Sequence, residues 1–297
     1  MTIGEGMKNI LVSGAGGFLG VELVKQLANN DDVKVFALSG QKDRLSQIFG
    51  SHGNFELVSN VPQGVDVFIN CVFPANANGM QLASGLDYIT DLYLETRVHN
   101  VKSVINISTQ RVYPQDKEDP ATEDTTPDLG PKYAVGKYAV EKLTNAIFHD
   151  IPHTNMRMAS LIGPNSDSRI SNRFVKQVME GNDIHIVADK QMFGFLDVRD
   201  AATGIAKYAL SDAEKWEETL NLGSGNAYSL EEIAECVVNV GIEFGFNSSI
   251  VIGDETGDIR NSMLDGSRLR NIIEWKAEIP LEKTVRDTYI HYMKENS

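Results

Sequence analysis

The chain has 297 residues, enough for one large domain or two smaller ones with a sizeable core. Hydrophobic residues make up 42% and charged residues 23%, so collagen-like, coiled-coil and disordered classes are excluded for most of its length. With 27 basic and 41 acidic residues the formal net charge is −14, which argues against nucleic acid and anionic membranes as partners.

Neither a membrane anchor nor a cysteine-based site is expected. No apolar run approaches the roughly 18 residues of a membrane span, and residues 1–7 are too few and too polar for a signal peptide. The two cysteines, Cys71 and Cys236, cannot build a disulfide framework or a four-cysteine zinc site. We therefore expect a cytoplasmic protein without a bound metal.

The first half of the chain alternates strands with helices. Strands are predicted at 8–13, 33–38, 55–58, 65–70 and 103–108. A helix with an apolar face follows the first strand. Strands that are apolar almost throughout suit a parallel sheet covered on both faces. The pattern predicts an α/β fold, a doubly wound parallel Rossmann-type sheet with a smaller C-terminal substrate lobe.

Beyond residue 150 the alternation loosens, although 155–161 and 221–222 still read as strands. We assign residues 1–160 to a dinucleotide-binding Rossmann domain, with returns to it near 195–225. Residues 161–297 form mainly a substrate-binding lobe interleaved with the first domain. The loop 116–128 carries six carboxylates, and it fits either a solvated surface loop or a lid.

A glycine-rich turn follows the first strand. Gly14, Gly17 and Gly20 form G-x-x-G-x-x-G at the junction with the next helix. Glycine allows a tight turn, a close approach of backbone to a pyrophosphate, and close packing of helix on strand. The helix N-terminus then offers amide donors to phosphate. We predict that the cofactor is bound by Gly14, Gly16, Gly17, Phe18, Leu19 and Gly20.

The end of the second strand bears on the choice of cofactor. An Asp or Glu there would bind the ribose 2′-hydroxyl of NAD. This chain has Ser39, Lys42 and Arg44 in that region instead, and these could receive a 2′-phosphate. The sequence therefore favours NADP over NAD.

Tyr133 and Lys137 form a candidate acid/base pair. They are four residues apart at the start of a predicted helix and so share one face. A tyrosine has a reference pKa of about 10, and a neighbouring ammonium favours its phenolate. Tyr138 and Lys142 have the same spacing but point about 140° away, and Pro131 marks a helix start that favours the first pair. Thr109 follows the fifth strand at the edge where such sheets bind ligands.

Several motifs together resemble one known family. They are Gly14-x-x-Gly17-x-x-Gly20, Ser108-Thr109-x-x-Val112-Tyr113, Tyr133-x-x-x-Lys137, Arg157 with Gly163-Pro164, Phe195-Leu196-Asp197-Val198-x-Asp200, Asn221-Leu222-Gly223-Ser224-Gly225 and Gly257-Asp258-Ile259-Arg260. In this order they resemble the extended short-chain dehydrogenase/reductases, the NAD-dependent epimerase/dehydratase group.

The resemblance implies a role for each matching residue. Thr109 would hold the substrate oxygen, Tyr133 would be the acid/base, and Lys137 would bind the nicotinamide ribose. Cys71, Val72 and Phe73 would line the cofactor. The resemblance also implies a homodimer through helices near 87–99 and 133–148, although the apolar surface there could equally be core.

Departures from the family pattern bear on the substrate. The 4,6-dehydratases have Asp-Glu after the catalytic Ser or Thr, whereas this chain has Gln110-Arg111, so dehydration is not expected. Arg111 would hold a polar substrate group or pair with a surface acid.

Two arginines that commonly bind the nucleotide diphosphate are replaced by Phe193 and Glu255, and neither can replace a guanidinium. Arg169, Arg173 or Arg260 would have to compensate. Ser160 stands where the family often has Asn. We assign the substrate side to Arg111, Ser160, Asn172 and Phe193.

We therefore predict an NAD(P)-dependent oxidoreductase acting on a keto-sugar or nucleotide-sugar carbonyl. A nucleotide-sugar 4-epimerase is the alternative, because the same three residues can oxidise and then reduce one carbon. A dinucleotide-sensing or scaffold protein without turnover is the alternative of a different class, but it would need only the glycine loop.

Overall fold

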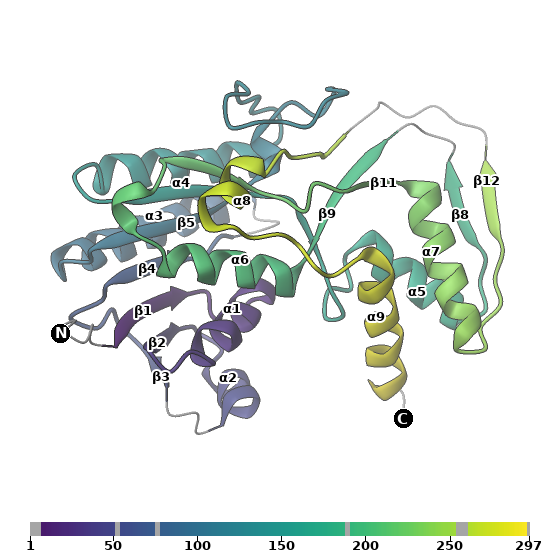
Figure 1. Cartoon of the computed structure of the whole chain (residues 1–297), viewed down its shortest axis with the longest axis horizontal. Coiled ribbons are helices and arrows are strands. Elements are labelled where there is room, and N and C mark those ends of the chain that lie inside the picture. The colour runs from purple at the N-terminus through teal and green to yellow at the C-terminus, as the bar shows by residue number, and fades with distance from the viewer. Residues whose placement is uncertain (1–6, 51–53, 75–77, 188–190, 254–260, 296–297) are drawn as a thin grey trace. The chain divides into compact units, whose positions relative to one another are not determined.

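The computed structural model describes residues 7–50, 54–74, 78–187, 191–253 and 261–295 (Figure 1). The chain divides into two compact units, and each is built from several stretches. The first contains residues Met1–Val112, Pro127–Met158 and Ala202–Leu220. The second contains Tyr113–Thr126, Ala159–Ala201 and Asn221–Ser297.

A seven-stranded sheet forms the centre of the first unit, with strand order β10-β6-β5-β4-β1-β2-β3. Neighbours from β6 to β3 run parallel. The strands are β1 (Lys8–Ser13), β2 (Val33–Leu38), β3 (Phe55–Val58), β4 (Val67–Asn70), β5 (Ser103–Thr109), β6 (His153–Met158) and β10 (Thr219–Leu222). The Rossmann-type sheet predicted from the sequence is confirmed.

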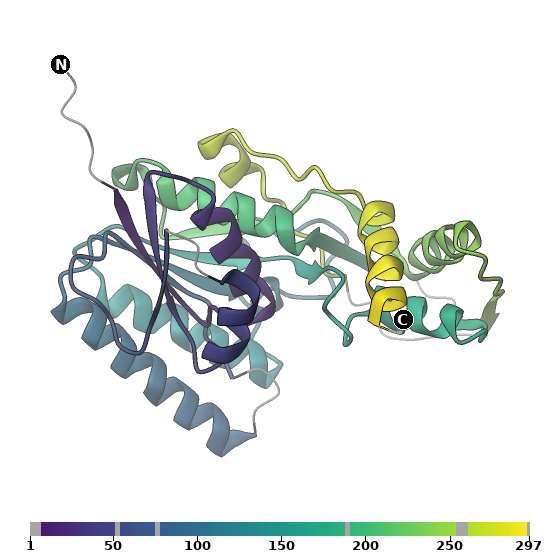
Figure 2. The ribbon, with the colours of Figure 1, turned by 90° about the horizontal axis from the view of Figure 1, so that it is seen from below.

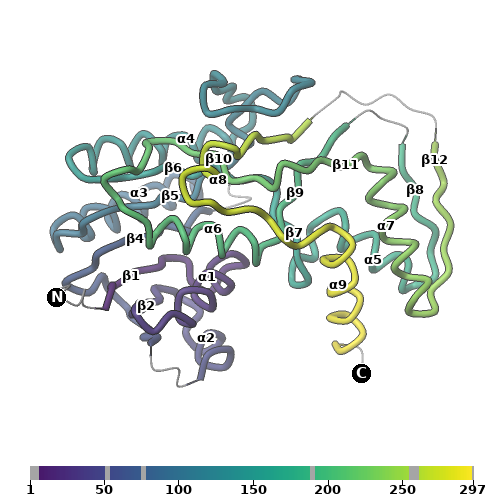
Figure 3. Tube along the Cα trace, in the orientation of Figure 1, coloured from purple at the N-terminus to yellow at the C-terminus, as the bar shows by residue number. Residues whose placement is uncertain are grey.

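Helices cover both faces of this sheet. Figure 2 shows α3 and α4 on one side and α1 and α6 on the other. The helices of this part of the chain are α1 (Phe18–Ala28), α2 (Lys42–Phe49), α3 (Gly79–Val98), α4 (Lys132–Ile147) and α6 (Val198–Leu210), with the 3-10 helices η1 (Gln110–Val112) and η2 (Ala213–Lys215). Figure 3 traces the repeated strand–helix–strand crossovers that keep the strands parallel.

The core between the sheet and α3 and α4 explains why the strands are apolar. Leu11, Phe68 and Val104 from three strands pack with Tyr93 of α3 and Val140 of α4, and all five are buried. Such a two-sided sheet needs apolar residues at successive positions rather than in alternation. The strands predicted at 8–13, 33–38 and 55–58 therefore have the predicted bounds, and the other two differ by one or two residues.

The strand predicted at 155–161 is in fact two strands. The chain leaves the first sheet after Met158, and β7 (Ser160–Ile162) pairs with β9 (Met192–Asp197) in a separate sheet. Ala159 stands at the break, and its amide donates to the carbonyl of Leu222 at 2.9 Å. The sequence of residues 155–161 gave no sign of this change of partner.

The second unit is built on two small sheets and a helical layer. The three-stranded sheet has the order β11-β9-β7, with β11 at Ala227–Ser229. The two-stranded sheet pairs β12 (Ile250–Gly253) with β8 (Ile184–Val187). The helices are α5 (Ile170–Met179), α7 (Leu230–Glu243), α8 (Ser267–Ile273) and α9 (Leu281–Glu295). Residues from α5, α7 and α9, among them Phe174, Val237 and Tyr289, share one buried cluster.

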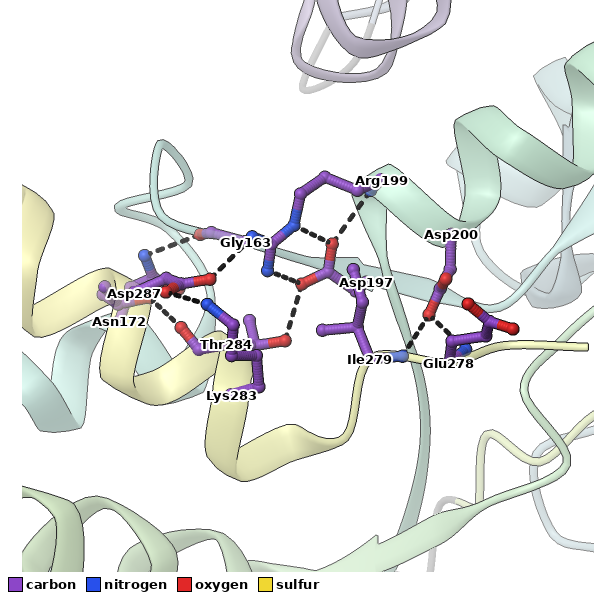
Figure 4. Close-up of polar contacts among 11 residues, drawn as sticks. Gly163, Asn172, Asp197, Arg199, Asp200, Glu278, Ile279, Lys283, Thr284 and Asp287 are labelled. Atoms are coloured by element: carbon purple, nitrogen blue, oxygen red, sulfur yellow. Dashed lines mark hydrogen bonds and ion pairs between the residues drawn. The ribbon is translucent and has the colours of Figure 1, made fainter. Parts of the chain in front are cut away.

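Asp197 ends β9 and Asp200 lies in α6, and both belong to the motif Phe195-Leu196-Asp197-Val198-x-Asp200. Their carboxylates accept hydrogen bonds from α9 and from the residues that precede it (Figure 4). Asp197 accepts hydrogen bonds from Arg199 and, at 2.6 Å, from the hydroxyl of Thr284. Asp200 accepts from the backbone amides of Glu278 at 3.0 Å and Ile279 at 2.8 Å. The motif therefore has a structural role in this chain.

The acid-rich loop is anchored within the second unit. Glu123 accepts a hydrogen bond from the amide of Asn221 at 2.8 Å, and Arg268 forms an ion pair with Asp124 at 3.0 Å. The backbone of Ala121 also bonds to Met263 and Asp265. The loop is therefore more than a solvated segment.

Across the described ranges, no helix combines the length and the apolar character needed to cross a membrane. Within the same ranges, no three His, Cys, Asp or Glu side chains gather as metal ligands.

Candidate active site

The glycine loop is as tight as the motif predicts. Gly14 has a φ of +67°, and a Cβ built on it would lie 3.0 Å from the carbonyl carbon of Cys71. A Cβ on Gly20 would lie 2.2 Å from the carbonyl oxygen of Gly14. The amide of Gly17 donates to that same oxygen at 2.9 Å, and α1 begins at the next residue. Backbone and helix N-terminus thus form a cradle that only glycine permits, which fits a dinucleotide phosphate.

The residues after β2 lie directly against this loop. A Cβ on Gly16 would come within 2.8 Å of Ser39 Oγ. Arg44 donates to the carbonyl of Gly16 at 3.1 Å and to Gln41 Oε1 at 3.2 Å, and Lys42 bonds to Ser59 Oγ. The two cations that the sequence assigned to a phosphate are therefore engaged with protein groups.

The acid/base pair lies on the first turns of α4. Pro131 precedes the helix, as predicted, and its backbone is extended. Tyr133 is 37% exposed, whereas Lys137, one turn further on, is only 6% exposed. Lys137 Nζ donates to the carbonyl oxygen of Ile107 at 2.8 Å. That bond fixes the ammonium two residues before Thr109 on β5.

Phe73 contacts both members of the pair. Its ring packs edge-on against Tyr133 with 5.3 Å between centroids, and Lys137 Nζ lies 4.6 Å from the centre of the Phe73 ring. The segment that carries Phe73 is held by Asn70, whose Oδ1 accepts from the amide of Val72 at 3.1 Å. The structure therefore brings Tyr133 and Lys137 together with Phe73, and a role of these residues in binding the cofactor stays a prediction.

Burial governs the charges at this edge. It lowers the pKa of Lys137 to about 8, against the opposing effects of Cys71 and Glu141. Burial also raises the pKa of the Cys71 thiol to about 12, although Lys137 lowers it. At neutral pH Lys137 is an ammonium and Cys71 is a neutral thiol.

Thr109 ends β5 and is 8% exposed. Its hydroxyl accepts from the amide of Arg111 at 3.2 Å, which leaves the hydroxyl proton to donate elsewhere. Arg111 itself is exposed. The second pair with matching spacing differs, because Lys142 is exposed and its ammonium lies 4.7 Å from the centre of the Tyr138 ring.

The other residues assigned to the substrate lie in the second unit. Ser160 is half-buried in β7, and Phe193 is half-buried in β9, where it stacks on Phe195 with 5.7 Å between centroids. Asn172 is fully buried, and its amide donates to the carbonyls of Gly163 at 3.0 Å and Pro164 at 3.1 Å (Figure 4). Asn172 thus holds the loop after β7, and a contact with substrate stays a prediction. Glu255, Arg260 and the motif 257–260 lie outside the described residues.

Sequence reasoning missed a buried ion pair between α4 and β6. Glu141 accepts from Arg157 Nε at 2.9 Å and from Arg157 Nη2 at 2.7 Å, and also from the hydroxyl of Ser108. A signal was present, because Tyr133, Lys137 and Glu141 repeat every four residues and must share one helix face.

Sequence reasoning also missed a row of polar side chains across the seven-stranded sheet. Ser13, Asn70, Asn106 and Asn155 are paired in register on four neighbouring strands. Ser13 donates to Asn70 at 2.8 Å, Asn70 to Asn106 at 3.2 Å, and Asn106 to Asn155 at 2.9 Å. Asn155 then donates to Asn145 of α4 at 2.6 Å. The row connects Ser13, which precedes the glycine loop, to α4, which carries Tyr133 and Lys137.

The chain was then compared with known proteins. Residues 10–223 match the model of the NAD-dependent epimerase/dehydratase family. The chain belongs to this family. It is therefore an NAD-dependent enzyme of the extended short-chain dehydrogenase type, and the predicted resemblance is confirmed.

Individual relatives are distant but span nearly the whole chain. GDP-L-fucose synthase 1 of Arabidopsis thaliana is 25% identical to this chain, and the match covers 96% of this chain and 93% of the relative. UDP-glucuronic acid decarboxylase 6 of the same plant is 24% identical, with 92% of this chain and 85% of the relative covered. Among solved structures, UDP-glucuronic acid 4-epimerase from Bacillus cereus, in complex with UDP-glucuronic acid and NAD, has a TM-score of 0.81 at 19% identity. That likeness covers 97% of this chain and 99% of the epimerase, and it shows the fold.

The prediction that NADP is preferred over NAD was wrong. The matching family is NAD-dependent, and the solved epimerase was crystallised with NAD. The structure supplies a physical reason, because Arg44 is bonded to Gly16 and Gln41 and Lys42 to Ser59. Cations near the end of β2 indicate a 2′-phosphate site only when their charge faces the ribose rather than neighbouring protein groups.

Proposed function

We propose that this enzyme epimerises a nucleotide sugar at a hydroxyl-bearing carbon through an oxidation and a reduction at that carbon. The observation that carries the proposal is the joint placement of Tyr133 and Lys137 against Phe73, with Lys137 bonded to the strand that ends in Thr109. NAD, when bound, supplies a hydride acceptor and donor for such a cycle. The glycine cradle, with Gly14 and Gly20, fits that cofactor.

Tyr133 moves the proton. It is the more exposed member of the pair, and the neighbouring ammonium of Lys137 stabilises its phenolate. As a base the phenolate takes the proton of a sugar hydroxyl, and as an acid the phenol returns it. Thr109 holds the same sugar oxygen through its hydroxyl proton.

The residue after Thr109 argues against dehydration. Gln110 is buried and its amide cannot exchange a proton as a carboxylic acid does. Elimination of water needs such a group beside the carbon that loses its hydroxyl. A sugar that keeps all its hydroxyl groups, with the configuration of one carbon inverted, is therefore the favoured product.

Net reduction of a keto-sugar is the second candidate, supported by the 25% identical GDP-L-fucose synthase 1. Incubation with UDP-sugars and no added cofactor separates the two, with products followed by proton NMR. An epimerase interconverts the sugars with the cofactor it carries, whereas a reductase stops unless a reduced nicotinamide is supplied. Cofactor binding without turnover of any sugar would contradict both and favour a sensor.

We further propose that the protein forms a homodimer through α3 and α4. Leu94 and Val98 on α3 are 50% and 74% exposed, and Val135 on α4 is 46% exposed. Exposed apolar side chains that gather on neighbouring helices favour association with a second copy.

A further inference from the structure

Glu141 is a buried carboxylate that the proposed proton transfer does not use. It is 2% exposed, and its partner Arg157 is 5% exposed. The guanidinium contacts both carboxylate oxygens, which is the bidentate geometry of a strong pair. Ser108 adds a third hydrogen bond to one of those oxygens.

Stability alone is a weak explanation for this pair. Removing two charges from water costs several kcal/mol each, and apolar side chains of similar volume are often equally or more stabilising. The helix already packs on the sheet through apolar residues such as Val140. The position of this pair, between α4 and β6, therefore points to a role in function.

The bonds of Glu141 lead to the residues beside the acid/base set. Ser108 directly precedes Thr109, and Arg157 is the register partner of Ser108 on β6. One turn earlier on the same helix face, Lys137 bonds to Ile107. Two consecutive turns of α4 are thus fastened to two consecutive residues of β5, immediately before Thr109.

The charge of Glu141 also acts on Lys137. The groups that face Lys137 are Cys71, the Phe73 ring, the carbonyl of Ile107, and Glu141 on its own helix. Cys71 is a neutral thiol near pH 7, because burial raises its pKa to about 12. Glu141 is therefore the anion that favours the ammonium.

We propose that Glu141, clamped by Arg157 and Ser108, is a positioning residue of the active site. It fixes the helix that carries Tyr133 and Lys137 against the strand that carries Thr109, and it supplies the negative charge that keeps Lys137 an ammonium. This inference rests on the proposed proton transfer by Tyr133, but the effect of Glu141 on the charge of Lys137 can be measured without any substrate.

The first test follows the charge of Lys137 directly. The protein is labelled with ¹³C at lysine Cε, the Lys137 signal is assigned by its loss in Lys137→Met, and pH titrations are recorded without substrate. In Glu141→Gln the titration midpoint of Lys137 should fall by about 1 pH unit. The control Asp66→Asn removes another acidic partner of the same unit, at the far end of β5, where Asp66 pairs with Lys102, and should leave the midpoint unchanged.

The second test separates positioning from folding. Glu141→Leu/Arg157→Met removes both charges, so no unpaired charge is left buried and the variant should fold with wild-type thermal stability. Its kcat at neutral pH should still fall about tenfold or more, with KM little changed, and its Lys137 midpoint should also fall. Wild-type kcat together with a wild-type midpoint in this variant would overturn the inference. If the wild type turns over no sugar, the proposed function fails, and the midpoints alone still decide whether Glu141 controls Lys137.

Discussion

An alanine at position 20 should distort the glycine loop and weaken NAD binding without unfolding the protein. The added Cβ would lie 2.2 Å from the carbonyl oxygen of Gly14 and 2.8 Å from the Cα of Ala15. Unstrained contacts are about 3.5 Å, so the loop or the helix must move by about 1 Å. The obstacle is backbone, which cannot rotate out of the way as a side chain can.

The cost can be estimated in two parts. Overpacking of this kind typically lowers the free energy of unfolding by about 1–3 kcal/mol. A shift of about 1 Å also spoils hydrogen bonds from the loop amides to the cofactor phosphates. Losing about 1.4–2.8 kcal/mol of binding free energy would raise the Kd for NAD by about 10–100-fold.

Calorimetric titration of the cofactor-free protein with NAD measures this effect. The matched control is Gly79→Ala at the start of α3, where an added Cβ meets no described atom within 4 Å beyond the adjoining residues and the helix itself. The control should bind NAD as the wild type does. A Kd for Gly20→Ala within twofold of the control would refute the idea that this loop receives the phosphates.

Three further outcomes are expected. Asn106→Leu removes the central member of the buried polar row and the hydrogen bonds that Asn70, Tyr93 and Asn155 make to it. Urea unfolding should show a loss of about 3 kcal/mol, and a loss below about 1 kcal/mol would contradict the role of the row. Folding lowers the pKa of Lys137 to about 8 from 10.5, so the unfolded chain binds more protons at this group between these values. Across this window the free energy of unfolding of the wild type should therefore rise relative to that of Lys137→Met, which shares the opposing titration of Cys71, and a constant difference between the two would contradict the shift. Leu94→Arg/Val98→Arg should convert a dimer into a monomer in light scattering, and a dimer that persists would exclude this face.

The parts of the fold that depend on local pattern could be predicted from the sequence. The strands 8–13 and 33–38 were predicted at their observed bounds because burial on both faces leaves short runs that are mostly apolar. The glycine loop was predictable for a similar reason, since Gly14 needs a positive φ and Gly20 has no room for a Cβ. Each of these constraints acts within a few residues of the chain.

Features that depend on contacts distant in sequence were missed. Asn70, Asn106 and Asn155 lie in three different strands, and only the register of the sheet reveals that they form a row. Arg44 was interpreted as a phosphate ligand because the sequence does not show that its guanidinium reaches the carbonyl of Gly16. The break at Ala159 was missed because the residues on both sides of it suit a strand, and only the pairing shows that the partner strand changes.

The central claim is that Tyr133 transfers the proton, and a Tyr133→Phe variant tests it most directly. Removing one hydroxyl from a half-exposed side chain leaves the ring packing on Phe73, so folding and NAD binding should match the wild type. The rate of sugar interconversion, followed by NMR at saturating substrate, should fall at least about 100-fold. Full turnover by Tyr133→Phe would contradict the account.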